Sequence, residues 1–239
     1  MALSLFTEPA EFDMPHPPLS VAIFLVLEEA ICAAWSVLRQ QPPAGFDLAK
    51  AKETVVTHHL HETLQDKVWN RAIVDGFDAE IFSSVARGPE VRSFHGSHLD
   101  KRPDMVVRLV DIPERVRPSQ YGIFIECKPV DADHPMVSHY CNKGILRFVL
   151  GEYAWAMTEA MMIGYVDSRG NPVEALGSAL KKRKAAAVLP ACEPTMCARS
   201  ASAAGAPVAI TEHGRNFVYI ENGQAAPAIM LRHLWLQRN

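Results

Sequence analysis

Two acidic residues and a lysine stand at the ends of apolar runs, where they could share one site. Asp104 precedes one such run, and Glu126 and Lys128 close another run 22 residues later. Side chains two apart on a strand share a face, so Glu126 and Lys128 should lie on one side and Cys127 on the other, buried side. The spacing suits a pair of adjacent strands, which would bring Asp104 to the same place.

These side-chain types suit phosphodiester hydrolysis. Carboxylate oxygens bind Mg²⁺, which keeps several waters, polarises a phosphoryl oxygen and can lower the pKa of an attacking water. We expect Asp104 and Glu126 to be ligands, and the Lys128 ammonium to orient that water and offset charge in the transition state. The competing interpretation is a solvated group of strand-end salt bridges, which contributes little energy.

A helix is predicted over residues 47–70, with Asp47 as its N-cap. At 100° per residue and with Leu60 as the reference, Glu53 lies at about +20°, within the apolar stripe. Glu62 lies about 200° away, on the solvated face. Glu53 is therefore expected to point inward. The competing interpretation of Glu53 is an exposed residue near the helix N-terminus, where negative charge is mildly favoured.

The pattern along the chain predicts an α/β fold. The helix predicted over residues 47–70 is followed by three apolar runs, a long helix-like segment and a further strand, giving the order α-β-β-β-α-β. They occupy residues 79–85, 105–110, 121–126, 135–160 and 161–166. Beyond them we expect a helix at 173–188, an Ala/Ser-rich loop at 189–207 and two or three strands within 208–236.

The motifs Pro103-Asp104 and Glu126-Cys127-Lys128 resemble those of the PD-(D/E)XK superfamily of restriction-endonuclease-like nucleases, and the element order agrees over residues 47–166. The resemblance implies a restriction-endonuclease-like core with a mixed central sheet flanked by helices. It also implies Mg²⁺-dependent cleavage of DNA, with Mn²⁺ as a substitute, in prokaryotic defence or restriction. A glutamate of the first core helix often joins the metal site in that superfamily. The expected metal ligands are Glu53, Asp104 and Glu126.

The segment 140–153 is similar to the second core helix of uncharacterised relatives of these nucleases. Lys143 and Arg147 are four residues apart and share a helix face, where they could bind phosphate. Arg102, next to the first motif, is expected to bind nucleic acid as well. Gly144 and Gly151 could permit close approach of a neighbouring element.

Composition limits the remaining possibilities. The 239 residues, 49% of them hydrophobic, fit one large domain or a domain with an appendage. We divide them into a leader and N-terminal helix (1–46), a nuclease core (47–166) and a C-terminal extension packed on the core (167–239). The net charge of −3 requires any nucleic-acid contact to be local. Five cysteines without paired spacing and no signal-peptide pattern indicate a reducing cytoplasm.

The apolar stretch 19–38 is predicted to be a buried or interface helix rather than a membrane span, because Glu28 and Glu29 interrupt it. Two-fold symmetry would let two sites cut a duplex, so a homodimer is one expectation, and control by an ATPase or another defence partner is a second. The rival function is a nuclease-like but silent scaffold, in which this helix docks a partner protein.

Other polar groups carry weaker signals. A zinc site at His58, His59 and His61 is disfavoured, because only His58 and His61 have helical spacing and no cysteine pair or HExxH motif accompanies them. The basic run 181–184 suits a nucleic-acid backbone and a solvated face equally well. The cysteines expected to stay unbridged and without a role are Cys192 and Cys197. The residues that could reach substrate phosphates are His213, Arg215 and His233.

Overall fold

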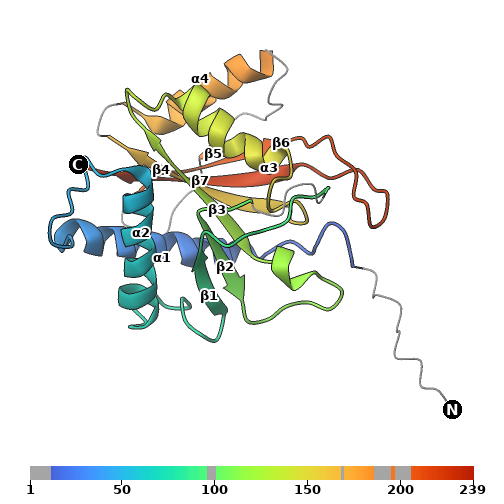
Figure 1. Cartoon of the computed structure of the whole chain (residues 1–239), viewed down its shortest axis with the longest axis horizontal. Helices are drawn as coiled ribbons and strands as arrows, with labels where there is room; N and C mark the ends of the chain where they lie inside the picture. The colour runs from blue at the N-terminus through green and yellow to red at the C-terminus, as the bar shows by residue number, and fades with distance from the viewer. Residues whose placement is uncertain (1–11, 96–100, 168–169, 186–194, 197–205) are drawn as a thin grey trace.

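The computed structural model describes residues 12–95, 101–167, 170–185, 195–196 and 206–239. It is a mixed α/β fold in which an open, mixed sheet is flanked by helices (Figure 1). The helical elements are α1 (Val21–Gln40), α2 (Glu53–Thr63), η1 (Leu64–Trp69), η2 (Pro118–Gln120), η3 (Met136–Ile145), α3 (Leu146–Val149) and α4 (Pro172–Ala185). The strands are β1 (Phe82–Arg87), β2 (Met105–Leu109), β3 (Ile123–Val130), β4 (Glu159–Val166), β5 (Thr195–Met196), β6 (Val208–His213) and β7 (Ile229–Gln237).

The sheet has a parallel centre and antiparallel wings. Its order is β1-β2-β3-β4-β7-β6-β5, and β3, β4 and β7 run parallel. The outer strands β1, β2, β6 and β5 pair antiparallel with their neighbours. Almost every residue of β3 and β4 is buried, as expected for parallel strands covered on both faces.

Helices cover both faces of this centre. On one face, Trp35 of α1 stacks on Tyr165 of β4 with ring centroids 5.5 Å apart. On the other face, Tyr140 of η3 stacks on Trp235 of β7 at 4.8 Å. Figure 1 shows α1 and α2 on one side of the sheet and η3, α3 and α4 on the other.

Helix α1 is long and apolar enough to cross a membrane by length and composition, and half of its most apolar window is buried inside the fold. Glu28, whose position in this stretch argued against a membrane span, is buried and accepts a hydrogen bond from Arg232 Nε at 2.7 Å. The helix thus provides part of the core, and Arg232 of β7 compensates the charge of its buried carboxylate.

The N-cap assigned to Asp47 is wrong. The Asp47 carboxylate accepts the backbone N–H of Ala49 at 3.0 Å, and its carbonyl accepts that of Ala51, which closes a separate turn. The extended residue Lys52 then begins α2 at Glu53. A similar aspartate turn at Asp78 delays the first strand from residue 79 to Phe82.

The long helix predicted over residues 135–160 is also wrong in its second half. It ends at Val149, and residues 150–157 form an irregular segment before β4. Gly151 and Ala154 adopt positive φ angles of 66° and 52°, which a helix cannot accommodate. The segment is nevertheless buried, because Tyr153 and Trp155 pack into the interior.

Of the strands expected within residues 208–236, the described part of the chain contains two, β6 and β7. Strand β7 lies between β4 and β6 and pairs with β4 from Glu159↔Met230 to Val166↔Gln237. The end of the chain therefore completes the same sheet that carries the predicted site. Much of the loop expected at 189–207 lies outside the described residues.

Candidate functional site

The site forms where β2 and β3 separate. Their pairing ends at Met105↔Ile125, so the next residues of β3 have no strand partner on that edge. The Asp104 carboxylate replaces the partner, because its Oδ2 accepts the Cys127 N–H at 2.7 Å. The predicted strand pairing thus does bring Asp104 beside Glu126.

Lys128 lies at the centre of the site. Its Nζ is 2.8 Å from Glu126 Oε1, 2.8 Å from Glu53 Oε1 and 3.7 Å from Asp104 Oδ2. It also donates to the Cys127 carbonyl at 2.8 Å. Only 7% of the lysine side chain is exposed, so this is a partly desolvated network and not a solvated strand end.

Glu53 reaches the site from the first turn of α2. Its side chain is 24% exposed and contacts Lys128, so the inward orientation predicted from the helical angle is confirmed. Glu62 faces solvent, as predicted, and pairs with His58 and His59. The two glutamates of this helix therefore occupy different environments.

Glu126 is held from both sides. Lys128 binds its Oε1, and the buried hydroxyl of Tyr153 donates a hydrogen bond to its Oε2. Arg147 Nε lies 3.6 Å from Oε1. The Glu126 side chain is only 2% exposed. Its position is therefore fixed by contacts with Lys128 and Tyr153 and by the nearby charge of Arg147.

Glu126 and Asp104, which share the buried Lys128 ammonium, have raised pKa values. Burial and the charge of Asp104 raise the pKa of Glu126 to about 7. Burial also raises the pKa of Asp104. Burial alone would lower the pKa of Lys128, but Glu126, Asp104 and Glu53 outweigh it and raise that pKa. The positive charges of Lys128 and Arg147 lower the pKa values of the two carboxylates but do not outweigh burial.

The donor set suits a hard cation, because all three candidate ligands are carboxylates. The Lys128 ammonium lies between them, however. Among the described residues, the three potential ligand atoms that lie within 4.8 Å of one another belong to His58, His59 and Glu62, and not to the three carboxylates of this site. Glu53, Asp104 and Glu126 would have to close around an ion as Lys128 moves aside.

A row of cationic or ionisable side chains borders the carboxylates along η3 and α3. His139, Lys143 and Arg147 recur every fourth residue. His139 Nε2 lies 3.7 Å from Glu53 Oε2, Lys143 is exposed, and Arg147 contacts Glu126. Burial and the neighbouring His134 lower the pKa of His139. The row places Lys143 and Arg147 beside the predicted site.

Gly144 lies where η3 packs closely on the sheet, as its position suggested. A Cβ at Gly144 would lie 2.6 Å from Met162 Cε and 3.4 Å from Lys128 Cγ. The helix therefore passes directly over the stem of the central lysine. The π-helical geometry of η3 is of a kind often found at functional sites.

Arg102 is the one predicted site residue held elsewhere. It is exposed and forms its ion pair with Glu90, in the segment that follows β1. Two site residues escaped sequence reasoning. His139 had a signal, the four-residue spacing with Lys143 and Arg147, whereas Tyr153 stood in a segment mistaken for helix.

The histidine cluster, the basic run and the cysteines lie apart from this site. His61 bonds the Val85 carbonyl at 3.0 Å, which leaves His58 and His59 to pair with Glu62. Lys181 and Lys182 of the basic run are exposed, and the side chains after them are not described. Cys32, Cys127 and Cys141 are buried, while Cys192 and Cys197 lie outside the described residues.

The phosphate-binding role considered for three C-terminal residues is wrong, because they serve the interior. His213 and His233 are fully buried and both bond Thr211 Oγ1 at 2.7 Å. Arg215 donates to the carbonyls of Pro227, Ala154 and Trp155.

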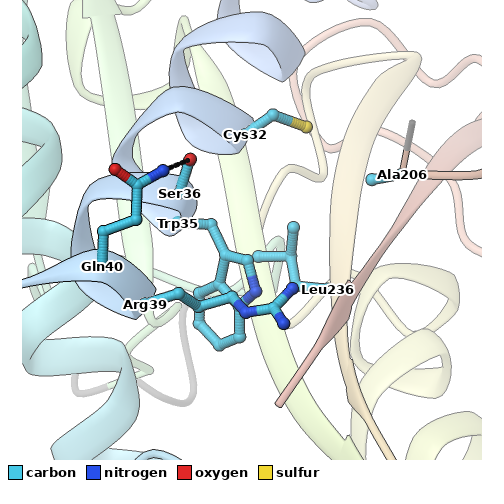
Figure 2. A pocket seen from close by; sticks show the side chains of 7 residues that line it. All are labelled: Cys32, Trp35, Ser36, Arg39, Gln40, Ala206 and Leu236. Atoms are coloured by element: carbon cyan, nitrogen blue, oxygen red, sulfur yellow. Dashed lines mark hydrogen bonds between the residues drawn. The ribbon is translucent and has the colours of Figure 1, made fainter. Parts of the chain in front are cut away.

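A cavity of about 400 Å³ lies on the opposite face of the sheet (Figure 2). It is lined by Trp35, Arg39 and Leu236, among others, at the end of α1. Trp35 packs on the same face as Cys127, whereas Glu126 and Lys128 point to the other face. This cavity is therefore separate from the carboxylates.

No protein-family model, curated protein or solved structure matches the chain.

Proposed function

We propose that this protein is a metal-dependent endonuclease of the PD-(D/E)XK type that hydrolyses phosphodiester bonds in DNA. One observation carries the proposal: Glu53, Asp104 and Glu126 surround the buried ammonium of Lys128 at the open edge of β3. The same arrangement follows from the motif resemblance. Its three carboxylates would attract a divalent cation.

The residues that would hold Mg²⁺, or Mn²⁺ in its place, are Glu53, Asp104 and Glu126. When bound, the ion would polarise the phosphoryl oxygen and supply an acidic water. The Tyr153 hydroxyl keeps Glu126 in place through a hydrogen bond, and Arg147 does so through an ion pair. Glu126 would then be the ligand whose position is set before the ion binds, whereas Glu53 would have to exchange Lys128 for the ion.

Lys128 and the row on η3 and α3 would act on the substrate. The Lys128 ammonium, released from Glu53, would orient the attacking water and stabilise negative charge on the reacting phosphate. Arg147 and the exposed Lys143 would bind neighbouring phosphates. Arg102, two residues before Asp104, could release Glu90 and bind a substrate phosphate at the edge of the site.

We further propose a cytoplasmic role in prokaryotic defence or restriction, which rests on the resemblance alone. Each chain offers one such site and would cut one strand, so a homodimer is the simplest way to cut a duplex. An ATPase or another defence protein could control it.

Cleavage assays on plasmid, linear duplex, single-stranded DNA and RNA test the proposal directly. In Mg²⁺ or Mn²⁺ we expect DNA cleavage by the wild type, and none in EDTA. Lys128→Ala and Asp104→Asn should abolish cleavage while the circular dichroism spectrum stays native. Glu53→Gln should lose most activity, whereas Glu62→Gln, on the solvated face of the same helix, should retain it. Full activity of Lys128→Ala would contradict the assignment.

Metal binding separates the enzyme from a silent scaffold without requiring cleavage. At a free Mg²⁺ concentration 100 times Kd, the folded state gains about 2.7 kcal/mol. For a chain of this size that corresponds to a rise in Tm of about 5–10 °C. We expect this rise in differential scanning fluorimetry, and its loss in Asp104→Asn but not in Glu62→Gln. A Tm independent of Mg²⁺ and Mn²⁺ would favour the scaffold.

A further inference from the structure

A second cavity of about 400 Å³ opens beyond Arg147, between the segment after β1 and the segment after β6. Its walls include Phe94, Leu150, Glu152, Asn216 and Phe217. The volume lies within the range of small-ligand sites, about 300–1,000 Å³.

This aromatic cleft is connected to the carboxylate site through Arg147. The Arg147 guanidinium lies 3.6 Å from Glu126, and the backbone carbonyl of Arg147 accepts the N–H of Glu152 at 2.9 Å. Glu152 in turn pairs with Lys101 at 3.1 Å, which compensates its charge at the cleft wall. The turn that closes α3 thus joins Arg147, which lies at the carboxylates, to Glu152, which lies at the cleft wall.

The cleft has a fixed aromatic wall. Phe94 stacks on Phe217 with ring centroids 4.3 Å apart and 21° between the planes. The Arg215 guanidinium lies 5.2 Å from the Phe217 centroid. Gly151 allows the stack to sit against the backbone, because a Cβ there would lie 2.9 Å from both rings. Phe217 is buried, whereas Phe94 is only partly buried and faces the cavity.

The opposite wall provides groups of other kinds. Leu150 is 47% exposed and provides an apolar edge. Asn216 is exposed, and its side chain makes no hydrogen bond with any described residue. An aromatic face, an apolar edge and a free amide match the flat face and polar rim of a nucleobase.

We propose that this aromatic cleft binds one unpaired nucleobase of the strand whose phosphate Arg147 holds. The inference rests on the proposed nuclease function and specifies its substrate: nucleic acid with an unstacked base next to the cleavage site. A base inside a duplex is already stacked on both faces, so single strands, ends and loops would be preferred. Phe94 would stack on the base, and Asn216 would contact its edge.

Binding in EDTA tests the cleft separately from cleavage. Single-stranded and duplex oligonucleotides carrying 2-aminopurine would be titrated with the full-length protein, and fluorescence quenching would report stacking. Phe94→Leu removes the ring and keeps apolar volume, while Phe94→Tyr keeps the ring. Ile220→Ala, an exposed residue 69% accessible on the same β6–β7 connection, is the control.

We expect quenching with the single strand, and affinity that falls about 5- to 150-fold in Phe94→Leu, the range for loss of one stacked base. Phe94→Tyr and Ile220→Ala should bind like the wild type. Equal affinity in Phe94→Leu, absence of quenching, or no binding by the wild type would overturn the cleft. Quenching that depends on Phe94, together with no cleavage in Mg²⁺, would instead reject hydrolysis and retain the cleft.

Discussion

At the scale of single residues, the site is defined by an imbalance between one ammonium and three carboxylates. Lys128 is over-compensated and its pKa rises, whereas Glu126 and Asp104 are under-compensated and their pKa values rise as well. Burial is the largest cause of both carboxylate shifts, and the Lys128 charge opposes it, so the ammonium does not offset the full cost of burying the two carboxylates.

Tyr153→Phe tests how Glu126 is held. The change removes the hydroxyl that donates to Glu126 Oε2 and leaves a buried carboxylate oxygen without that partner. We expect the free energy of unfolding to fall by about 1–3 kcal/mol at pH 8, measured with urea. Because the lost donor favours the charged form, the pKa of Glu126 should rise further. The loss of stability should therefore be smaller at pH 5.5, where Glu126 is mostly protonated.

Tyr121→Phe is the matched control. Tyr121 is also buried, and its hydroxyl bonds to no residue in the part of the chain that the structure describes. Its removal should change stability little at either pH. Equal losses in both variants at pH 8 would show that the hydroxyl of Tyr153 does not support Glu126.

At the scale of elements, local patterns predicted the site wherever its geometry is local. Glu126 and Lys128 share a strand face, and Glu53 lies on the inward side of a helix, so period and angle were sufficient. Tyr153 reaches Glu126 through an irregular segment whose bends occur at Gly151 and Ala154. Ala154 carries no sequence signal for a positive φ. The predicted helix therefore extended beyond Val149, and Tyr153 was not recognised as a site residue.

The parallel strand order at the centre of the sheet likewise could not be predicted from local sequence patterns. The pairing of β4 with β7 joins segments about 70 residues apart, from Glu159↔Met230 to Val166↔Gln237. Apolar runs indicate that buried strands exist but do not encode which strands are neighbours. The mixed α/β class could be predicted, while the insertion of β7 between β4 and β6 could not.

The pairing of β4 with β7 depends on a glycine. Gly164 lies opposite Trp235, and a Cβ there would approach ring carbons of Trp235 to 2.2 and 2.4 Å. The indole is rigid and buried, so Gly164→Ala should destabilise the fold by about 1–3 kcal/mol in urea unfolding. Gly144→Ala is the control, because its closest contact would be the flexible end of Met162. A loss in Gly144→Ala as large as in Gly164→Ala would show that the rigid ring does not set the cost.

At the scale of the whole molecule, two buried groups give stability opposite dependences on pH. His233 lies fully buried between the Tyr140 hydroxyl at 3.0 Å and Thr211 Oγ1 at 2.7 Å. Burial and the neighbouring His213 lower its pKa well below 6.5. Below pH 6.5 the unfolded chain therefore binds more protons than the folded protein at this residue, and the free energy of unfolding falls as pH decreases.

Glu126 acts in the opposite sense. Its pKa of about 7 in the folded protein exceeds the ordinary value of 4.5, so between these pH values the folded state binds more protons. Its contribution to the free energy of unfolding therefore rises as pH falls from 7 towards 4.5. In the wild type the two contributions partly cancel between pH 5 and pH 7.

Removing either titrating group should expose the other. Glu126→Gln should make the free energy of unfolding at pH 5, relative to pH 8, lower than in the wild type by roughly 1–3 kcal/mol. His233→Gln should make the free energy of unfolding at pH 5, relative to pH 8, higher than in the wild type. The carboxylates whose pKa values are raised are then no longer opposed by His233. Urea unfolding curves at half-unit steps from pH 5 to pH 8, in EDTA, would measure both. If all three proteins gave parallel pH profiles, neither buried group would titrate in the assigned direction, and Glu126 could not be under-compensated.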